Sequence, residues 1–224
     1  MTNTFPFAII EKPTDSRKSA KGACEKLKGE KGKKRKQELL QIAYQLFIRK
    51  GYEETSIDDI IAEAHIAKGT YYYHFPSKEA TLEAVIDWMI DCEVRKAKEI
   101  LDSPLSVPQK LVGVITSLRP EQHESSITDT LNRKENLIMH EKVGRKMIGE
   151  AVPLLTQIVS EGIAQGVFAC DLIKERVRMI LIMSHHLFDD GSFTPEDVTV
   201  FLDTVEKMLG AQPGTLGYIR KLIH

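Results

Sequence analysis

The sequence predicts an all-α protein. Apolar residues recur at helical spacing along most of the chain, and no segment has the alternating pattern of a confident strand. Two short helical patterns, over residues 57–64 and 68–75, are separated by a break of about three residues. Two short helices joined by a tight turn form a helix-turn-helix unit, whose second helix enters the DNA major groove. We therefore expect an N-terminal three-helix DNA-binding domain followed by a C-terminal helical domain.

The first 30 residues lack a sustained period and are punctuated by proline and glycine. We interpret residues 1–30 as a flexible basic N-terminal arm. Its lysines either reach phosphates beside the main site, as the arms of other DNA-binding folds do, or belong to a merely disordered tail.

The net charge of −1 hides a strong asymmetry along the chain. Residues 17–50 contain twelve Lys or Arg residues and three acidic residues, a net charge of +9, so the rest of the chain carries −10. A basic segment in a neutral chain is either a solvated tail or an electrostatic footprint for nucleic acid. Beside a helix-turn-helix pattern, the second interpretation is favoured.

Start and stop signals define the helices of the predicted DNA-binding domain, residues 31–78. The first helix runs from about Lys33 to Lys50 and stops at Gly51. Ser56, three residues before Asp59, is a capping-box-like start for the next helix. The second short helix, Lys68–Phe75, is stopped by the following proline, after which Ser77 is placed to cap a long helix.

Residues 79–224 are predicted to form the C-terminal helical domain, which we expect to mediate dimerisation. Its last helix has a clear start, with threonine as the cap and Pro195 in the first turn. The last two helices carry apolar residues on more than one face, which favours a homodimer. The predicted helices run from after Ser77 to Leu101, Gln109–Leu118, Ser126–Arg133, residues 135–166 with a kink or restart at Pro153, Asp171–Phe188 and Pro195–Leu209.

Residues Ile57 to Glu79, in particular KGTYYYHF followed by SKE, resemble the DNA-binding core of the tetracycline-repressor (TetR) family. The resemblance includes the preceding helix, Gln37–Lys50, and the Gly51-Tyr52 turn. It covers roughly a fifth of the chain, and several positions agree in order and spacing. It implies an all-helical homodimer that binds a palindromic operator in double-stranded DNA, represses transcription and is released by a small-molecule ligand.

The recognition helix supplies the expected base contacts, Lys68, Gly69 and Tyr73. Lys68 can donate to guanine, and Gly69 lets the backbone approach closely or leaves room for a thymine methyl. Alternatively, Lys68 contacts a phosphate. Tyr73 is expected to touch a base or a sugar. Tyr71 is expected to pack in the core. By resemblance, the phosphate contacts are Thr70, Tyr72, His74 and Lys78, and Ser56, or Thr55 beside it, anchors a further phosphate with the helix N-terminus behind it.

Two positions depart from the family pattern. His65 occupies a place in the turn where glycine is usual, and a histidine adopts a left-handed backbone only at a cost. Ala67 occupies a place where a capping Ser or Thr is common, and its methyl group cannot satisfy a free N–H. The rigidity of the turn and one phosphate contact depend on these positions.

The resemblance implies that the C-terminal domain, residues 79–224, binds a ligand, and we expect the cavity between the long helix after Ser77 and the long central helices. His140 is a ligand contact, a metal ligand or an ordinary half-buried polar residue, and neither a metal nor a cofactor is expected. The predicted lining, which ordinary core packing would explain equally, is Trp88, Cys92, Asn136, Met139, His140 and Met183.

Several functional classes lack support in the sequence. No run of 18 apolar residues exists and the apolar N-terminal piece is too short for a secretory signal, so we expect a cytoplasmic protein without a membrane partner. The three scattered cysteines indicate thiols. No hydrolase, zinc-protease or phosphate-binding motif occurs, so no enzyme is expected. The alternative to a ligand-responsive repressor is a helical adaptor, or a non-specific DNA-binding module without an inducer.

Overall fold

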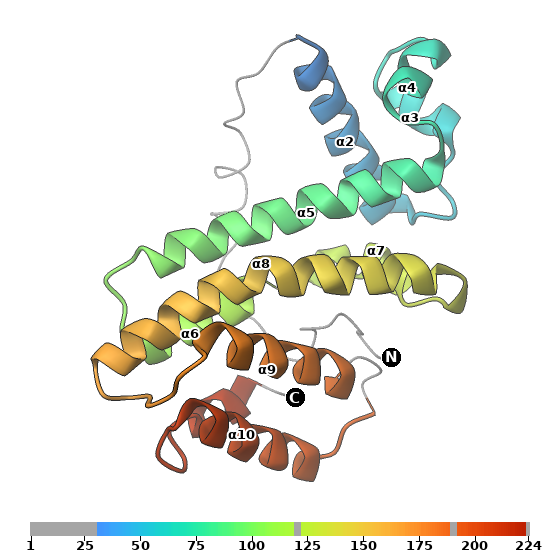
Figure 1. The fold of residues 1–224 in the computed structure, drawn as a ribbon. Helices are drawn as coiled ribbons and strands as arrows, with labels where there is room; N and C mark the ends of the chain where they lie inside the picture. Colours follow the sequence, from blue (N-terminus) through green and yellow to red (C-terminus); the bar gives the residue numbers. More distant parts are fainter. Residues whose placement is uncertain (1–30, 119–121, 189–191, 223–224) are drawn as a thin grey trace. The chain divides into compact units, whose positions relative to one another are not determined.

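The computed structural model describes residues 31–118, 122–188 and 192–222, and within these it is helical, without a strand (Figure 1). None of the helices in these ranges is both long enough and apolar enough to cross a bilayer. The predicted N-terminal arm lies outside the described residues. The α-helices are α2 (Lys31–Lys50), α3 (Ile57–Glu63), α4 (Lys68–His74), α5 (Lys78–Leu101), α6 (Val107–Ser117), α7 (Ser125–Leu131), α8 (Leu137–Ala164), α9 (Ile173–Phe188) and α10 (Pro195–Leu209), with 3-10 turns η1 (Gln122–Glu124), η2 (Lys134–Asn136) and η3 (Gly217–Leu222).

The chain forms two compact units. Of the described residues, 31–92 and 122–143 belong to the N-terminal unit, and 93–118, 144–188 and 192–222 belong to the C-terminal unit. The predicted DNA-binding segment, residues 31–78, lies wholly in the N-terminal unit. That unit also includes the start of α5, all of α7 and the first turns of α8.

Capping side chains begin α3 and α10 as the sequence predicts. The Asp59 backbone N–H donates to the Ser56 hydroxyl at 3.0 Å, and the Ser56 N–H donates to the Asp59 carboxylate at 2.8 Å. Thr194 and Asp197 form the same capping box at the start of α10. Because each box satisfies two backbone donors that have no partner within the helix, both starts are well determined.

Apolar side chains from α2 to α5 form the core of the N-terminal unit. Phe47, Ile60 and Phe75 are buried, and Tyr71 is completely enclosed. The Tyr71 hydroxyl lies 2.6 Å from the Thr81 hydroxyl of α5, so its polar end is satisfied inside the core. The expectation that Tyr71 packs in the core is confirmed.

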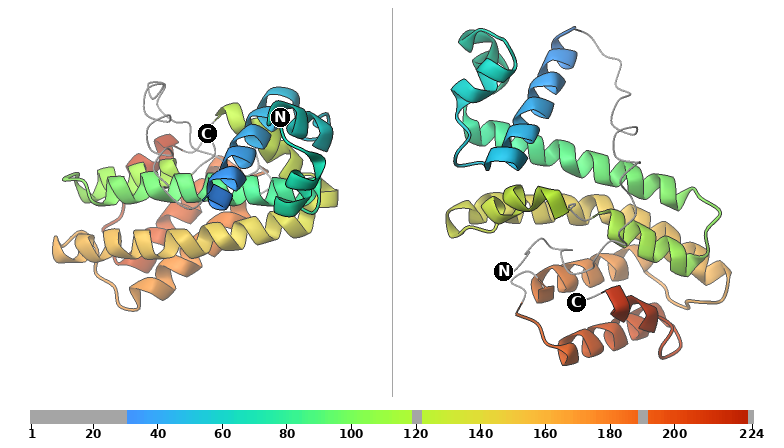
Figure 2. Two further views of the ribbon diagram at one scale, coloured as in Figure 1. Left: turned by 90° about the horizontal axis from the view of Figure 1, so that it is seen from above. Right: turned by 180° about the vertical axis from the view of Figure 1, so that it is seen from behind.

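In the C-terminal unit, α9 and α10 lie side by side (Figure 2). An ion pair with a Lys110 Nζ to Glu161 Oε2 distance of 2.7 Å joins α6 to α8. The predicted helix ends agree with the observed ones to within about two residues, and two differences have a clear physical reason. α6 begins at Val107 and not at Gln109, because a proline is tolerated in the first turn of a helix. α8 continues through Pro153, so a restart there is wrong; buried neighbours on both sides hold it as one helix.

The cysteines also differ from expectation. Cys170 is a free thiol, whereas Cys92 takes part in a disulfide, so the prediction of three thiols is wrong for Cys92. Spacing along the sequence does not report which sulfur atoms approach one another in space, and this limits what the scattered pattern could establish.

Candidate nucleic-acid interface

Helix α4 has two distinct faces. Tyr71 and Phe75, four residues apart, are buried and attach the helix to the core. Tyr72 is 44% exposed and Tyr73 is 83% exposed. These two consecutive tyrosines place exposed aromatic surface on the side of α4 away from the core, and this outward face of α4 is the candidate contact surface.

The N-terminal end of α4 presents a basic side chain next to open space. Lys68 is exposed, and its Nζ lies 3.5 Å from the exposed Asp58 carboxylate. Such a solvated pair is weak, so the ammonium group is free to move to another partner. A Cβ atom added at Gly69 would find no other atom within 4 Å. The backbone at Gly69 is thus accessible to a ligand that approaches closely.

The turn between α3 and α4 contains both of the unusual residues noted in the sequence. His65 has a φ angle of 50°, a left-handed conformation that histidine adopts less easily than glycine. Ala67 is the N-cap residue of α4 and makes no side-chain hydrogen bond there. The expectation that both positions depart from favourable local chemistry is confirmed.

Lys78, the first residue of α5, is held by two groups of the turn between α2 and α3. Its Nζ donates to the Glu53 carbonyl oxygen at 3.1 Å and lies 4.3 Å from the centroid of the Tyr52 ring. Burial, followed by the negative charges of Glu79 and Glu53, raises the pKa of Tyr52 to about 12. The Tyr52 ring therefore stays neutral and provides an aromatic face for the ammonium group.

The remaining predicted phosphate contacts differ in accessibility. Thr55 is completely buried, and its hydroxyl donates to the Gly51 carbonyl oxygen at 2.7 Å. It cannot reach DNA in this conformation, which differs from expectation and leaves Ser56 as the candidate of that pair. Ser56 is exposed at the N-terminus of α3, while Thr70 and His74 are half-buried on α4.

The six predicted pocket residues do not form a described cavity. Five of them belong to the N-terminal unit, whereas Met183 belongs to the C-terminal unit. Trp88 packs its ring against Tyr44 at a centroid distance of 5.1 Å, and Asn136 donates to the Thr130 carbonyl oxygen at 2.7 Å. His140 is buried, and Met139 and Cys92 are half-buried. A ligand site at these residues remains a prediction.

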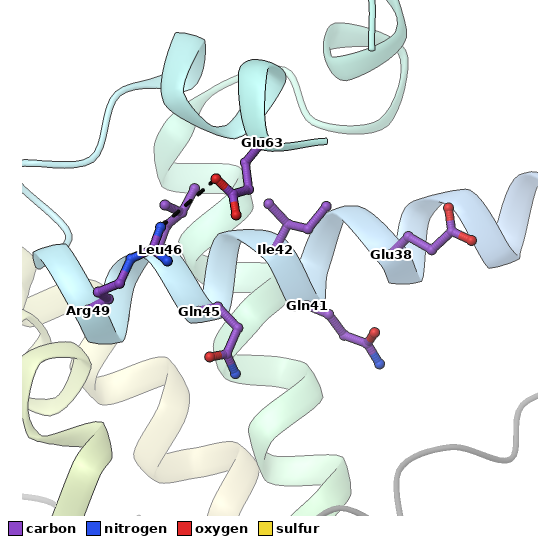
Figure 3. A pocket seen from close by; sticks show the side chains of 7 residues that line it. All are labelled: Glu38, Gln41, Ile42, Gln45, Leu46, Arg49 and Glu63. Atoms are coloured by element: carbon purple, nitrogen blue, oxygen red, sulfur yellow. Dashed lines mark ion pairs between the residues drawn. The ribbon is translucent and has the colours of Figure 1, made fainter. Parts of the chain in front are cut away.

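A surface groove of about 340 Å³ is found elsewhere, on α2 and the end of α3 (Figure 3). Ile42 and Leu46 point from α2 toward Glu63, while Gln41 and Gln45 point away from it. Arg49 and Glu63 form a loose pair at 3.9 Å. None of the predicted pocket residues lines this groove.

Sequence reasoning missed a set of polar contacts from η1, α7 and η2 to the helix-turn-helix region. Arg133 Nη1 donates to Glu53 Oε1 at 2.9 Å, across 80 positions of the sequence. The Tyr44 hydroxyl donates to Glu124 Oε1 at 2.8 Å, and the Ser126 hydroxyl donates to the Phe47 carbonyl oxygen at 2.9 Å. No local pattern marks such residues, because their partners are distant in the chain.

Comparison with known proteins identifies relatives of this site. The model of bacterial regulatory proteins of the tetR family matches residues 39–85. The transcriptional repressor KstR2 of Mycolicibacterium smegmatis is 32% identical over 143 residues, which are 62% of this chain and 69% of that protein. An uncharacterized transcriptional regulator of Bacillus subtilis, YerO, is 35% identical over 78 residues, only 35% of this chain and 27% of its own length.

The fold is also found in solved structures. The structure of RolR in complex with its ligand resorcinol superposes with a TM-score of 0.58. It shares 18% sequence identity, and the match covers 86% of this chain and 94% of the other. At this identity the likeness concerns the fold, in which an N-terminal helix-turn-helix domain precedes a C-terminal helical domain.

Proposed function

Because the chain belongs to the TetR family of bacterial regulatory proteins and is a DNA-binding transcriptional regulator, we propose that it is a repressor. In this proposal it binds a palindromic operator as a homodimer and is released by a small-molecule ligand. The observation that carries the proposal is the two-faced α4, in which buried Tyr71 and Phe75 anchor a helix that exposes Lys68, Gly69 and Tyr73. KstR2 of Mycolicibacterium smegmatis, a relative of which this chain covers 69%, is named as a repressor.

The proposed contacts follow from accessibility and from chemistry. Lys68, Gly69 and Tyr73 face bases, because residues at the start of a recognition helix reach base edges and Tyr73 is almost fully exposed. Phosphates are contacted by hydroxyl, imidazole and ammonium groups, together with the free N–H groups at the start of α3. These proposed phosphate contacts are Ser56, Thr70, Tyr72, His74 and Lys78.

The proposed dimer is formed by α9 and α10. Met179 of α9 and Val200 of α10 are 63% and 64% exposed, and Ile182 is 39% exposed. These apolar side chains lie on two helices that pack against each other, so a partner could cover them together. A two-fold symmetric dimer would direct two recognition helices into half-sites about 34–36 Å apart, one turn of DNA.

Release by a ligand requires that the ligand bind one conformation of the dimer more tightly than the other. α5 extends from Lys78, a proposed phosphate contact, into the C-terminal unit, so it is the helix through which a ligand could act. The candidates for ligand contact remain Trp88, Asn136, Met139, His140 and Met183, with Cys92 a candidate only as part of a disulfide.

Selection of bound genomic fragments at physiological salt tests the proposal. We expect enrichment of a palindrome that survives competition with bulk DNA, because base contacts add specificity to the phosphate term. Recovery of fragments without a shared sequence would favour a non-specific DNA-binding module. No retained DNA would favour a helical adaptor. The genes beside the selected fragments would then guide the choice of ligands to test for release.

A further inference from the structure

An ion pair connects the end of α7 to the turn between α2 and α3. Arg133 is the N-cap residue of η2, and its guanidinium donates to the Glu53 carboxylate at 2.9 Å. Both side chains are partly exposed, at 44% and 52%. A pair this open contributes little to folding, typically less than about 1 kcal/mol, so it is not needed to hold the fold.

Glu53 also contacts Lys78, which is one of the proposed DNA contacts. Its backbone carbonyl oxygen accepts the hydrogen bond from Lys78 Nζ at 3.1 Å. The ammonium group also lies over the Tyr52 ring, the neighbouring residue in the same turn. The position of residues 52 and 53 therefore determines where the Lys78 ammonium group is held.

Arg133 comes from a part of the chain that is itself fixed to α2. Glu124 is buried and accepts the Tyr44 hydroxyl at 2.8 Å, and the Ser126 hydroxyl donates to the Phe47 carbonyl oxygen at 2.9 Å. These contacts attach η1 and the first turn of α7 to the C-terminal half of α2. Arg133, just beyond the other end of α7, then reaches the turn that follows α2. The backbone that carries Arg133 is thus held in place, so its guanidinium can restrain Glu53.

We propose that Arg133 and Glu53 are positioning residues for DNA binding, which hold the turn so that Lys78 meets a phosphate in a prepared orientation. The inference rests on the proposed DNA-binding function. It assigns the α7–η2 junction a part in operator affinity, although it supplies no base contact. Pre-ordering a charged side chain reduces the entropy lost when it binds, which is how such a pair can favour affinity more than stability.

Neutralising Glu53 tests the proposal, because competing explanations predict opposite changes in the affinity for DNA. DNA repels carboxylates, so simple electrostatics predicts that Glu53→Gln tightens binding. If Glu53 positions the turn, Glu53→Gln weakens binding, by roughly 2- to 5-fold per protomer, the ratio that corresponds to an exposed ion pair. Glu54→Gln is the matched control, because Glu54 is an exposed neighbour for which the described contacts include no ion pair. It should leave binding unchanged or tighten it.

A double-mutant cycle with Lys78 separates positioning from direct contact by Arg133. Arg133→Ala alone should weaken operator binding as Glu53→Gln does, and Arg133→Lys should restore part of the loss. In a Lys78→Ala background, Arg133→Ala should have almost no further effect, because it acts through Lys78. Lys134→Ala, one residue along, measures the effect of removing a positive charge from the same place. Operator binding at one salt concentration and thermal unfolding are measured for every variant.

The outcomes distinguish this inference from the function on which it rests. If the parent protein selects no DNA sequence, the proposed function fails first. If the parent binds its operator and Glu53→Gln tightens binding, the positioning role is wrong. Equal losses from Arg133→Ala with and without Lys78 would show that Arg133 itself touches DNA, and would also overturn it. If the loss of operator affinity only parallels a loss of thermal stability, the pair has a structural role and the proposal is wrong. If Lys134→Ala causes the same loss of affinity, the effect is purely electrostatic and the proposal is also wrong.

Discussion

At the scale of single residues, Lys68 is the side chain best placed to carry sequence preference. It stands at the first position of α4, and its only described ion pair is a loose, exposed contact with Asp58. Breaking that contact costs little in water, whereas a lysine that donates to guanine O6 and N7 discriminates between base pairs. Affinity and specificity should therefore change together when Lys68 is removed.

We expect Lys68→Ala to lose roughly 1–3 kcal/mol of binding free energy on the preferred operator. On operators altered at the contacted base pair, the variant and the parent should bind almost alike. Both half-sites must be altered together, since an intact half-site would mask the effect. Competition over single-base variants of the half-site measures this. A uniform loss that keeps the parent's ranking of bases would instead place Lys68 on a phosphate.

Gly69 allows stability and binding to be separated. Glycine near the start of a helix is less favourable than alanine by up to about 1 kcal/mol, and a Cβ at this position meets nothing in the free protein. Gly69→Ala should therefore leave the melting temperature unchanged or raise it. If DNA approaches this backbone closely, the added methyl group should still weaken operator binding or alter base preference. Unchanged binding in a competition assay would show that Gly69 lies away from the bases.

At the scale of elements, the start of α3 depends on the charge of one carboxylate. Asp59 accepts from Lys50 Nζ at 2.9 Å, and from the hydroxyl and backbone N–H of Ser56. These hydrogen bonds, that of Lys50 first, hold the pKa of Asp59 well below its usual value of 3.8. A carboxyl group whose pKa is lower in the folded state stabilises the fold above its unfolded pKa and loses that contribution as pH falls.

We expect the parent to melt at a higher temperature than Asp59→Asn at pH 7. The difference should stay constant down to about pH 5 and shrink below about pH 4, since the unfolded carboxyl group titrates near 3.9. Asparagine keeps an oxygen that can accept from Ser56 but carries no charge for Lys50. Thermal unfolding of both proteins across this range provides the measurement. A difference that does not depend on pH would show that Asp59 acts by shape alone.

Local signals predicted most elements, because caps, glycines and helical spacing act within a few residues. The Ser56–Asp59 box, the Thr194–Asp197 box and the Gly51 stop required only neighbouring positions. The continuity of α8 through Pro153 could not be predicted in this way, since packing on both sides outweighs the local effect of a proline. Lengths and ends therefore depend on tertiary contacts more than the existence of helices does.

In the candidate site, too, some features follow from local sequence signals and others depend on tertiary contacts. The exposure of Lys68 and Tyr73 follows from a motif, but the burial of Thr55 depends on how the turn folds back on Gly51. The restraint of Glu53 by Arg133 joins residues 80 positions apart, which no single-sequence pattern reveals. A cavity formed by side chains from several helices is equally invisible to local reasoning, and the predicted lining residues were not found around the groove that the structure contains.

At the scale of the whole molecule, α9 and α10 carry apolar side chains that remain exposed to water in a single chain. Met179 and Val200 are nearly two-thirds exposed, whereas Val177 and Leu181 of α9 and Val198 and Leu202 of α10 are buried. Each apolar square ångström removed from water contributes about 25 cal/mol, and stable interfaces bury roughly 1,200–2,000 Å². The proposed palindromic operator would require two recognition helices, so dimerisation and operator binding should fail together.

We expect the parent protein to sediment as a dimer at micromolar concentration. Met179→Glu would place an unpaired charge in the interface, so it should shift the equilibrium to monomer and weaken operator binding at least tenfold. Gln157→Glu, which adds the same charge at an exposed position of α8, should remain dimeric. Circular dichroism of both variants would check that they are folded. A parent that sediments as a monomer, or a dimer that tolerates Met179→Glu, would show that α9 and α10 are not the surface on which two copies meet.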